Sequence, residues 1–170
     1  MFAVNRPLAA VLGCVFLIVA GAGAASLPEP TGKPILTVVG KIGVANKDGA
    51  AEFDIRMLEA LGTVAFETST PWYEGRVKFE GVPLTKLMAA VGATGETVVA
   101  VALNDYSAEI PVEDFAKYGP ILALKRDGAY MPVRDKGPLF LVYPYDSSEE
   151  LRQKKFYTRS VWQIARLEVK

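Results

Sequence analysis

KFEGVPLTKLMAAVG, residues 78–92, carries the clearest signal of the fold. Its first residues lead into Pro83, which suits the first position of a helix because its missing N–H needs no partner there. Gly92 marks the end of that helix. Apolar side chains recur between them at helical spacing, at Leu84, Leu87, Met88 and Val91. The stretch therefore predicts an amphipathic helix packed against a sheet.

Short apolar segments on both sides of this helix predict a sheet-rich domain. Strands are indicated at 35–39, 51–54, 63–70, 97–103, 121–125, 129–131, 139–143 and 161–169. Short helices are expected at 55–61 after a capping Asp54, near 112–118 where residues 108–111 open the helix, and from a Ser147–Glu150 capping box to Lys155. Strands dominate, and no regular alternation of strands and helices is present. We therefore predict an α+β fold in which mixed β-sheets carry short helices.

The first 24 residues read as a secretory signal peptide. Arg6 precedes an apolar run over residues 8–20, and small residues follow at 21–25. The run is shorter than the ~20 residues that span a bilayer, and no later segment approaches that length. We expect export to the periplasm without direct membrane insertion, an extended proline-rich tether over 25–34, and one domain over 35–170.

Composition excludes several kinds of chemistry. The chain has no histidine, and its one cysteine, Cys14, lies in the predicted signal peptide. The mature chain therefore lacks Ser-His and Cys-His nucleophiles, disulfides and thiolate metal ligands. The 19 basic and 19 acidic residues balance, so nucleic acid is not an expected partner. The paired carboxylates at 113–114 and within 146–150 lie where helices are expected to start, and the helix dipole explains them.

Aromatic side chains gather at turns and strand ends, where ligand sites are commonly built. Trp72 follows a proline, Tyr106 follows Asn104-Asp105, and Trp162 lies in an aromatic segment near the C-terminus. Aromatic faces beside amide, carboxylate and guanidinium groups suit a flat, hydrogen-bonding heterocycle. Core packing and turn chemistry explain the same residues, and both interpretations stay open at this point.

Four segments follow one another in a fixed order. They are the Gly-x-Pro-Leu helix entry at 79–88, the Asp-Gly hairpin at 126–132, the strand at 137–144 and the closing strand at 160–169. Their order resembles that of the oxidoreductase molybdopterin-binding domain, the fold of the sulfite oxidases, over roughly residues 35–170. The resemblance implies a sulfite oxidase-type molybdopterin-binding fold.

One position departs from that family. In its catalytic members a cysteine thiolate binds molybdenum, and here Thr68 takes its place within FETST, residues 66–70. A protonated hydroxyl is a poor substitute for a soft thiolate, so no metal is expected, while a pocket for the pterin ring can remain. Small exported proteins of this kind that lack the cysteine resemble periplasmic pterin-binding regulators. Such regulators pass a pterin signal to a membrane protein that controls cyclic di-GMP.

The leading prediction is a pterin-binding module with no catalysis of its own. Its ligand is a pterin, with molybdopterin among the candidates, and its partner is the periplasmic region of a membrane-bound diguanylate cyclase, phosphodiesterase or sensor. One alternative is a molybdopterin-dependent oxidoreductase with an altered metal ligand, whose cofactor phosphate would contact Arg134, Lys136, Arg159 and Ser160. Another is a structural partner that binds no small molecule. The predicted pterin-binding residues are Thr68, Trp72, Asn104, Asp105, Tyr106, Arg134, Lys136, Arg159, Ser160 and Trp162.

Overall fold

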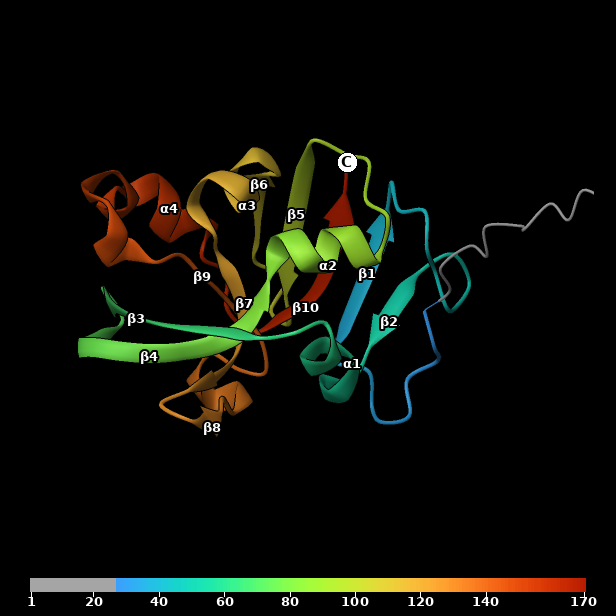
Figure 1. Cartoon of the computed structure of the whole chain (residues 1–170), viewed down its shortest axis with the longest axis horizontal. Helices are drawn as coiled ribbons and strands as arrows, with labels where there is room; N and C mark the ends of the chain where they lie inside the picture. The colour runs from blue at the N-terminus through green and yellow to red at the C-terminus, as the bar shows by residue number, and fades with distance from the viewer. Residues whose placement is uncertain (1–26) are drawn as a thin grey trace, which may run out of the picture.

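Two β-sheets and four short α-helices form the described part of the protein, residues 27–170 of a computed structural model (Figure 1). This arrangement confirms the predicted α+β fold of mixed sheets with short helices. The predicted signal peptide, residues 1–24, lies outside the described residues. Between residues 27 and 170, no helix combines the length and apolarity needed to cross a membrane.

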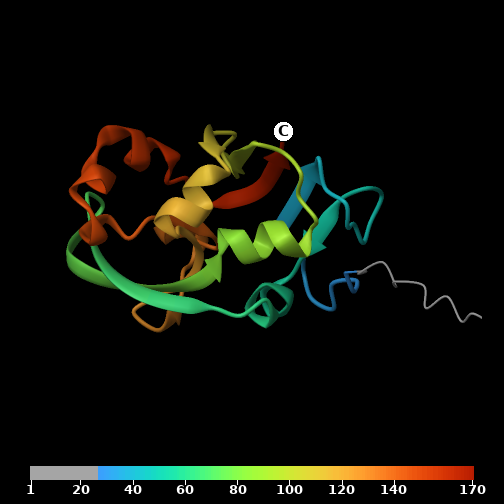
Figure 2. The same cartoon turned by 45° about the horizontal axis from the view of Figure 1, so that its top comes forward.

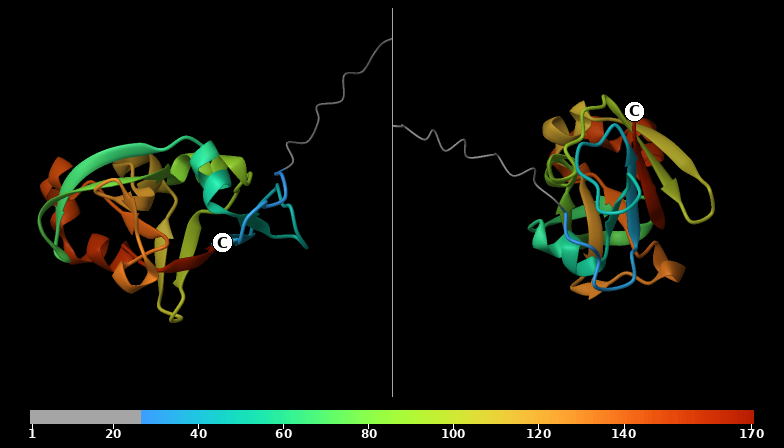
Figure 3. Two further views of the ribbon diagram at one scale, coloured as in Figure 1. Left: turned by 90° about the horizontal axis from the view of Figure 1, so that it is seen from below. Right: turned by 90° about the vertical axis from the view of Figure 1, so that its right-hand side faces the viewer.

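The first sheet is mixed. It contains β1 (Leu36–Gly40), β2 (Ala51–Phe53), β5 (Thr97–Ala102), β6 (Ser107–Pro111) and β10 (Ile164–Val169). Their order across the sheet is β2-β1-β10-β5-β6. β1 and β10 run parallel, and the other neighbours are antiparallel. The β5–β6 hairpin projects from the body of the domain, as the left view of Figure 3 shows.

The second sheet is built around a long hairpin. It contains β3 (Val64–Thr70), β4 (Tyr73–Pro83), β7 (Ile121–Arg126), β8 (Ala129–Tyr130) and β9 (Phe140–Val142). β3, β4, β7 and β8 pair in that order, and β9 also pairs with β7. The tip of the β3–β4 hairpin lies at the same end of the molecule as α4 (Lys154–Arg159) (Figures 1 and 2). Residues far apart in the sequence therefore meet at this end.

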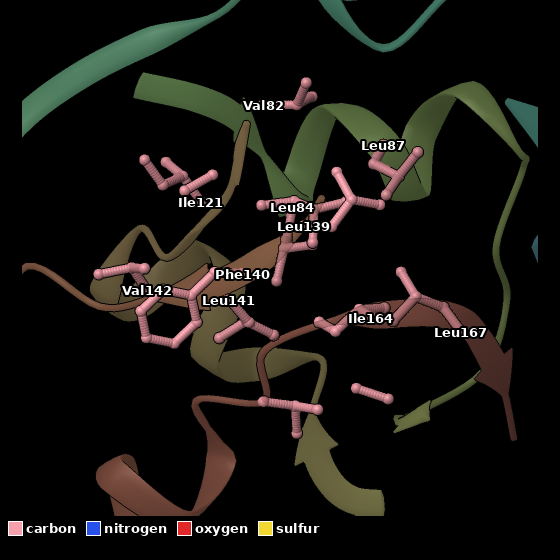
Figure 4. Close-up of a cluster of buried hydrophobic side chains, with 14 of the residues drawn as sticks. Val82, Leu84, Leu87, Ile121, Leu139, Phe140, Leu141, Val142, Ile164 and Leu167 are labelled. Carbon is pink, nitrogen blue, oxygen red and sulfur yellow. The ribbon is translucent and has the colours of Figure 1, made fainter. Parts of the chain in front are cut away.

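The predicted amphipathic helix is α2 (Leu84–Ala90), and it packs on the core as expected. It begins one residue later than predicted, because Pro83 still belongs to β4 and serves as the N-cap. The side chains of Leu84 and Leu87 are fully buried. They share one hydrophobic cluster with residues of both sheets, among them Val82, Ile121, Ile164 and Leu167, and with Leu139 just before β9 (Figure 4).

The remaining helical segments are short. They are α1 (Ile55–Ala60), α3 (Glu113–Tyr118) and the 3-10 turns η1 (Val133–Asp135), η2 (Tyr145–Ser147) and η3 (Glu149–Arg152). The predicted Ser147 capping box is wrong. Ser148 is the N-cap instead, its Oγ accepts the Glu150 N–H at 3.2 Å, and the segment it begins is η3 rather than a helix that runs to Lys155.

Two strands depart from the sequence prediction, because pairing with other strands outweighs their local sequence pattern. Residues 108–111 belong to β6 rather than to the opening of a helix, since Ala108 and Ile110 alternate into the core opposite β5. Residues 73–83 form one strand, β4, although no strand is predicted there from the sequence. β4 is stabilised by β3 on one side and β7 on the other.

Asp54 joins the N-terminal segment to α1. Its Oδ1 accepts the Met57 N–H at 2.9 Å as the N-cap of the helix. Its Oδ2 accepts the N–H groups of Thr31 and Gly32 at 3.0 and 2.8 Å. The bond from Met57, followed by that from Gly32, lowers the pKa of Asp54 below its ordinary value. Residues 27–34, within the predicted tether, have no regular secondary structure, and these bonds hold them against the domain.

Asp54→Ala is expected to lower the free energy of unfolding by about 2 kcal/mol at neutral pH, because the helix cap is lost and two further N–H groups lose their acceptor. Since the folded-state pKa of Asp54 is lowered, its contribution is complete above the ordinary aspartate pKa and is lost as the pH falls through the lowered value. Urea unfolding should therefore show the gap between wild type and variant narrowing below about pH 4. The exposed Glu74→Ala is the control. Equal stability of wild type and Asp54→Ala at pH 7 would contradict this role.

Candidate ligand site

A cavity of about 430 Å³ opens where the tip of the β3–β4 hairpin meets α4 and the β5–β6 turn. It is lined by Trp72, Ala102, Asn104, Tyr106, Lys154, Tyr157, Thr158, Ser160 and Trp162. Four of these residues are aromatic, and Lys154 carries the one charge in the lining. Small-molecule sites span about 300–1,000 Å³, so the cavity is large enough for a ligand of that class.

Trp72 occupies the turn between β3 and β4. The Thr70 hydroxyl accepts the N–H groups of Trp72 and Tyr73 at 3.3 and 3.2 Å, which fixes the turn. The indole makes edge-to-face contacts at ring-centroid distances of 5.4 to 6.2 Å with Phe140, Tyr145, Tyr157 and Trp162. Trp72 is therefore part of the cavity wall and also the centre of an aromatic cluster.

Trp162 forms the facing part of the wall. It lies just before β10 and pairs with Phe140 in an isolated β-bridge. Its ring centroid is 5.6 Å from that of Trp72, with an angle of 74° between the two planes. A flat ring that stacked on one indole would meet the other edge-on, which is a favourable arrangement for aromatic groups.

The turn between β5 and β6 supplies a polar side of the cavity. Asp105 adopts a left-handed conformation at φ 64°, and the Asn104 Oδ1 accepts the Tyr106 N–H at 3.3 Å. These are the turn features that the Asn-Asp pair predicts. The Tyr106 hydroxyl donates to the Thr158 carbonyl oxygen at 3.2 Å, so the turn is joined to α4 across the cavity.

Ser160 follows α4 and has a hydroxyl that is already bonded inside the protein. Its Oγ donates to the Phe156 carbonyl oxygen at 2.8 Å, so the Tyr145 hydroxyl is the donor in the short contact between Tyr145 and Ser160. Burial raises the pKa of Tyr145 above its ordinary value, which keeps that donor protonated. Ser160 retains one acceptor position for a ligand.

Arg159 is absent from the cavity lining and anchors α4 to α3 instead. Its NH1 lies 2.6 Å from Oδ2 of the buried Asp114, which also accepts the Tyr143 hydroxyl at 2.8 Å. Burial and then the charge of Asp114 raise the pKa of Tyr143, so this hydroxyl stays a donor. The helix-dipole explanation of Asp114 is therefore incomplete, because the carboxylate at the start of α3 is one half of a largely buried ion pair.

Thr68 lies on β3 with its side chain fully buried, and it does not line the cavity. Its hydroxyl donates to the Ser69 carbonyl oxygen at 3.3 Å and accepts the Asp146 N–H at 3.1 Å. The Asp146 carboxylate in turn accepts the Ser69 N–H at 2.8 Å, and this bond is the main cause of its lowered pKa. The Thr68 hydroxyl is thus committed to holding the hairpin against η2.

Arg134 and Lys136 lie beside the cavity rather than in its lining. Arg134 lines a separate hollow of about 250 Å³ together with Asp135. Asp135 accepts the Tyr73 hydroxyl at 3.0 Å and pairs with Arg126 at 2.6 Å, and burial raises the pKa of Tyr73 to about 12. Lys136 Nζ lies 4.7 Å from the centre of the Tyr73 ring and 5.3 Å from that of Trp162.

The structure brings half of the predicted site residues into one cavity. Trp72, Asn104, Tyr106, Ser160 and Trp162 line it, whereas Thr68, Asp105, Arg134, Lys136 and Arg159 lie outside the lining. The lining also includes Ala102, Lys154, Tyr157 and Thr158, which were not predicted. Tyr157 and Thr158 belong to the aromatic segment near the C-terminus that also contains Trp162, so the sequence indicated this segment but not these two residues. No sequence pattern indicated Lys154.

The donor set of the cavity fits an organic ring better than a metal. Indole and phenol rings, an amide, two hydroxyls and an ammonium group offer stacking and hydrogen bonds but no soft or anionic ligand. Within residues 27–170, histidine, cysteine, aspartate and glutamate form no group of three that could hold a metal ion. The residues present therefore suit the ring of a pterin cofactor and offer no evident protein bond to its metal.

Comparison with known proteins gives one family. A family model of the oxidoreductase molybdopterin-binding domain matches residues 54–148, more than half of the chain. No curated protein matches the chain. The matched range includes Trp72 and the β5–β6 turn, while α4 and Trp162 lie beyond its C-terminal limit.

Proposed function

This chain belongs to the oxidoreductase molybdopterin-binding domain family, and we propose that it binds a pterin through the organic ring, without a bond from the protein to a metal. The observation that carries this proposal is the aromatic cavity of Trp72 and Trp162, combined with a Thr68 hydroxyl that is buried and bonded elsewhere. Stacking on the indoles would supply affinity, and polar groups of Asn104 and Ser160 would select the hydrogen-bonding edge of the ring.

Molybdopterin itself is one candidate for this pterin. Its ring would lie in the same cavity. Lys154, which lines the cavity, and Lys136, whose Nζ lies 5.3 Å from the centre of the Trp162 ring, are cations that its phosphate could contact. Molybdenum, when such a cofactor carries it, supplies oxygen-atom transfer in the catalytic members of the family. Here the residues around the cavity bind and orient the ring, and Trp72 and Trp162 exclude water from its faces.

The proposed role of the bound pterin is that of a signal. In this proposal the chain is exported to the periplasm, and its loaded form contacts the periplasmic part of a membrane-bound enzyme or sensor that controls cyclic di-GMP. What supports this step is the signal-like N-terminus and the resemblance to exported regulators that lack the cysteine ligand. A gene for such a membrane protein beside this one would strengthen it.

The protein purified from the periplasm tests the binding proposal. We expect a fluorescent pterin to be released on denaturation, together with far less than one molybdenum atom per chain. One molybdenum per chain with sulfite-type turnover would show instead the alternative, a molybdopterin-dependent oxidoreductase with an altered ligand. Absence of any extractable heterocycle, together with no pterin-induced rise in the melting temperature, would favour a structural role.

Thr68→Cys is expected to leave the molybdenum content unchanged. The side chain at this position is buried and absent from the cavity lining, so a thiol there is not placed to bind a metal held in the cavity. The variant should lose about 1 kcal/mol of stability, because a thiol replaces a hydroxyl that makes two hydrogen bonds. Metal analysis of wild type and Thr68→Cys, expressed side by side, checks this. A gain to one molybdenum per variant chain would show that the pocket still has metal-binding geometry.

A further inference from the structure

Exposed apolar side chains lie at the cavity and beside it: Tyr106 and Trp162 line it, and hydrogen bonds of Gln163 hold the backbone of Leu103 and of Val133 next to Trp162. Leu103, Tyr106, Val133 and Trp162 keep 55, 48, 50 and 37% of their surface exposed. We call these four residues the mouth patch. They form the majority of the large exposed hydrophobic side chains between residues 27 and 170. Concentration of such side chains in one place marks an interaction surface more often than chance exposure does.

Hydrogen bonds from one residue hold the patch together across three segments. The Gln163 carbonyl oxygen accepts the Leu103 N–H at 2.9 Å, and its side-chain Nε2 donates to the Val133 carbonyl oxygen at 2.6 Å. Gln163 N–H also donates to the Lys136 carbonyl oxygen at 3.0 Å. The residue itself has a left-handed backbone at φ 54°, which is unusual for glutamine and persists only where the surroundings hold it. The β5–β6 turn, η1 and the start of β10 therefore form one preset surface.

Positive charge flanks this surface. Lys136, Lys154 and Arg134 lie in or beside it, and in the described part of the chain none of them makes a salt bridge. The charge of Asp135 is neutralised by its ion pair with Arg126. In the β5–β6 turn, η1 and the start of β10, Asp105 is then the remaining negative charge beside these three cations. Apolar anchors with a cationic border match an acidic partner, because complementary charge steers association and sets specificity.

We propose that the mouth patch is the docking site for an acidic segment of a partner protein that presents apolar side chains. Tyr106 and Trp162 belong both to this surface and to the cavity lining. A partner seated here would therefore cover the entrance and contact whatever the cavity holds. By linkage, the partner and the ligand then alter each other's affinity. The partner therefore binds the filled protein and the empty protein with different affinities. This last step rests on the proposed function, whereas the docking surface does not.

Two synthetic peptides test the surface directly. One combines glutamate with leucine and phenylalanine, and in the other each glutamate is replaced by lysine. We expect the acidic peptide to shift the backbone NMR signals of the mouth patch in isotope-labelled protein, with an affinity at least about tenfold higher than that of the lysine peptide and a marked loss in high salt.

Leu103→Asp and Val133→Asp provide matched variants, since neither side chain lines the cavity. Each should weaken binding of the acidic peptide by about tenfold or more. Val64→Asp, at an exposed residue at the far end of β3, should leave that binding unchanged. No binding of either peptide, equal binding of both, signal shifts elsewhere, or unchanged affinity of both variants would each overturn the proposal.

Pterin dissociation, measured with and without the acidic peptide, separates the docking surface from the proposed pterin binding. Reduced pterin should dissociate more slowly when the acidic peptide is bound, because the entrance is covered. If peptide binding maps to the mouth patch but no pterin binds, the docking surface stands and the pterin function fails. If pterin binds and the peptide does not, the pterin function stands and the docking surface fails.

Discussion

Arg159→Met is expected to lower the free energy of unfolding by about 3 kcal/mol. The Asp114 carboxylate is nearly fully buried and lies 2.6 Å from Arg159 NH1. Removal of the guanidinium leaves that charge with only the Tyr143 hydroxyl as a partner. An uncompensated buried charge is costly because neither water nor a counter-ion stabilises it. Chemical denaturation of wild type and variant measures the loss.

The double variant Asp114→Asn/Arg159→Met separates the ion pair from simple packing. Asparagine still accepts the Tyr143 hydroxyl, and no unpaired charge remains, so most of the lost stability should return. Arg159 directly precedes Ser160, which lines the cavity. Arg159→Met should therefore also lower the affinity for the ligand, and by more than the fraction of unfolded variant under the assay conditions explains. A loss that the double variant does not recover would show that packing of the long Arg159 side chain is what matters.

Trp72→Ala is expected to weaken pterin binding by about 10- to 100-fold, since stacking of a base on an aromatic side chain contributes roughly 1–3 kcal/mol. The indole lines the cavity, and its plane lies at 74° to that of Trp162, so its loss removes one wall of the site. The melting temperature should also fall, because four edge-to-face contacts disappear. The domain should remain folded, since the side chain is only half-buried and most of the core lies elsewhere. Fluorescence titration with a reduced pterin gives the affinity.

Two further variants show which role of Trp72 dominates. Trp72→Phe should keep most of the affinity, because a phenyl ring can still stack. Phe79→Leu, at a buried ring outside the cavity, should lower stability without changing the affinity. A lowered melting temperature with unchanged pterin affinity in Trp72→Ala would mean that the indole is a core residue and no part of the ligand site.

Local signals in the sequence predict much of the fold. The α2 helix follows from its apolar spacing, the Asp54 cap from its position before α1, and the Asn104–Tyr106 turn from its side-chain chemistry. β4 and β6 were missed, because those segments are strands through pairing with other strands of their sheets rather than through a strong local strand pattern. A short stretch of sequence does not show which other strand it will pair with.

In the candidate site, too, local sequence patterns predict some residues, and tertiary packing alone brings in the others. Aromatic residues at turns pointed to Trp72, Tyr106 and Trp162, and the structure places all three in one cavity. Lys154 has no distinguishing neighbour in the sequence, and it reaches the cavity only because α4 packs beside the β5–β6 turn. The buried pairing of Asp114 with Arg159 likewise depends on α3 and α4 meeting in three dimensions.

Calorimetric titration of the purified protein with a metal-free reduced pterin tests the central claim most directly, because it asks whether the organic ring alone is bound. We predict saturable binding with one pterin per chain, and weaker binding by Trp72→Ala. No heat of binding with the metal-free pterin, while the molybdenum-loaded cofactor binds at one per chain, would contradict the account.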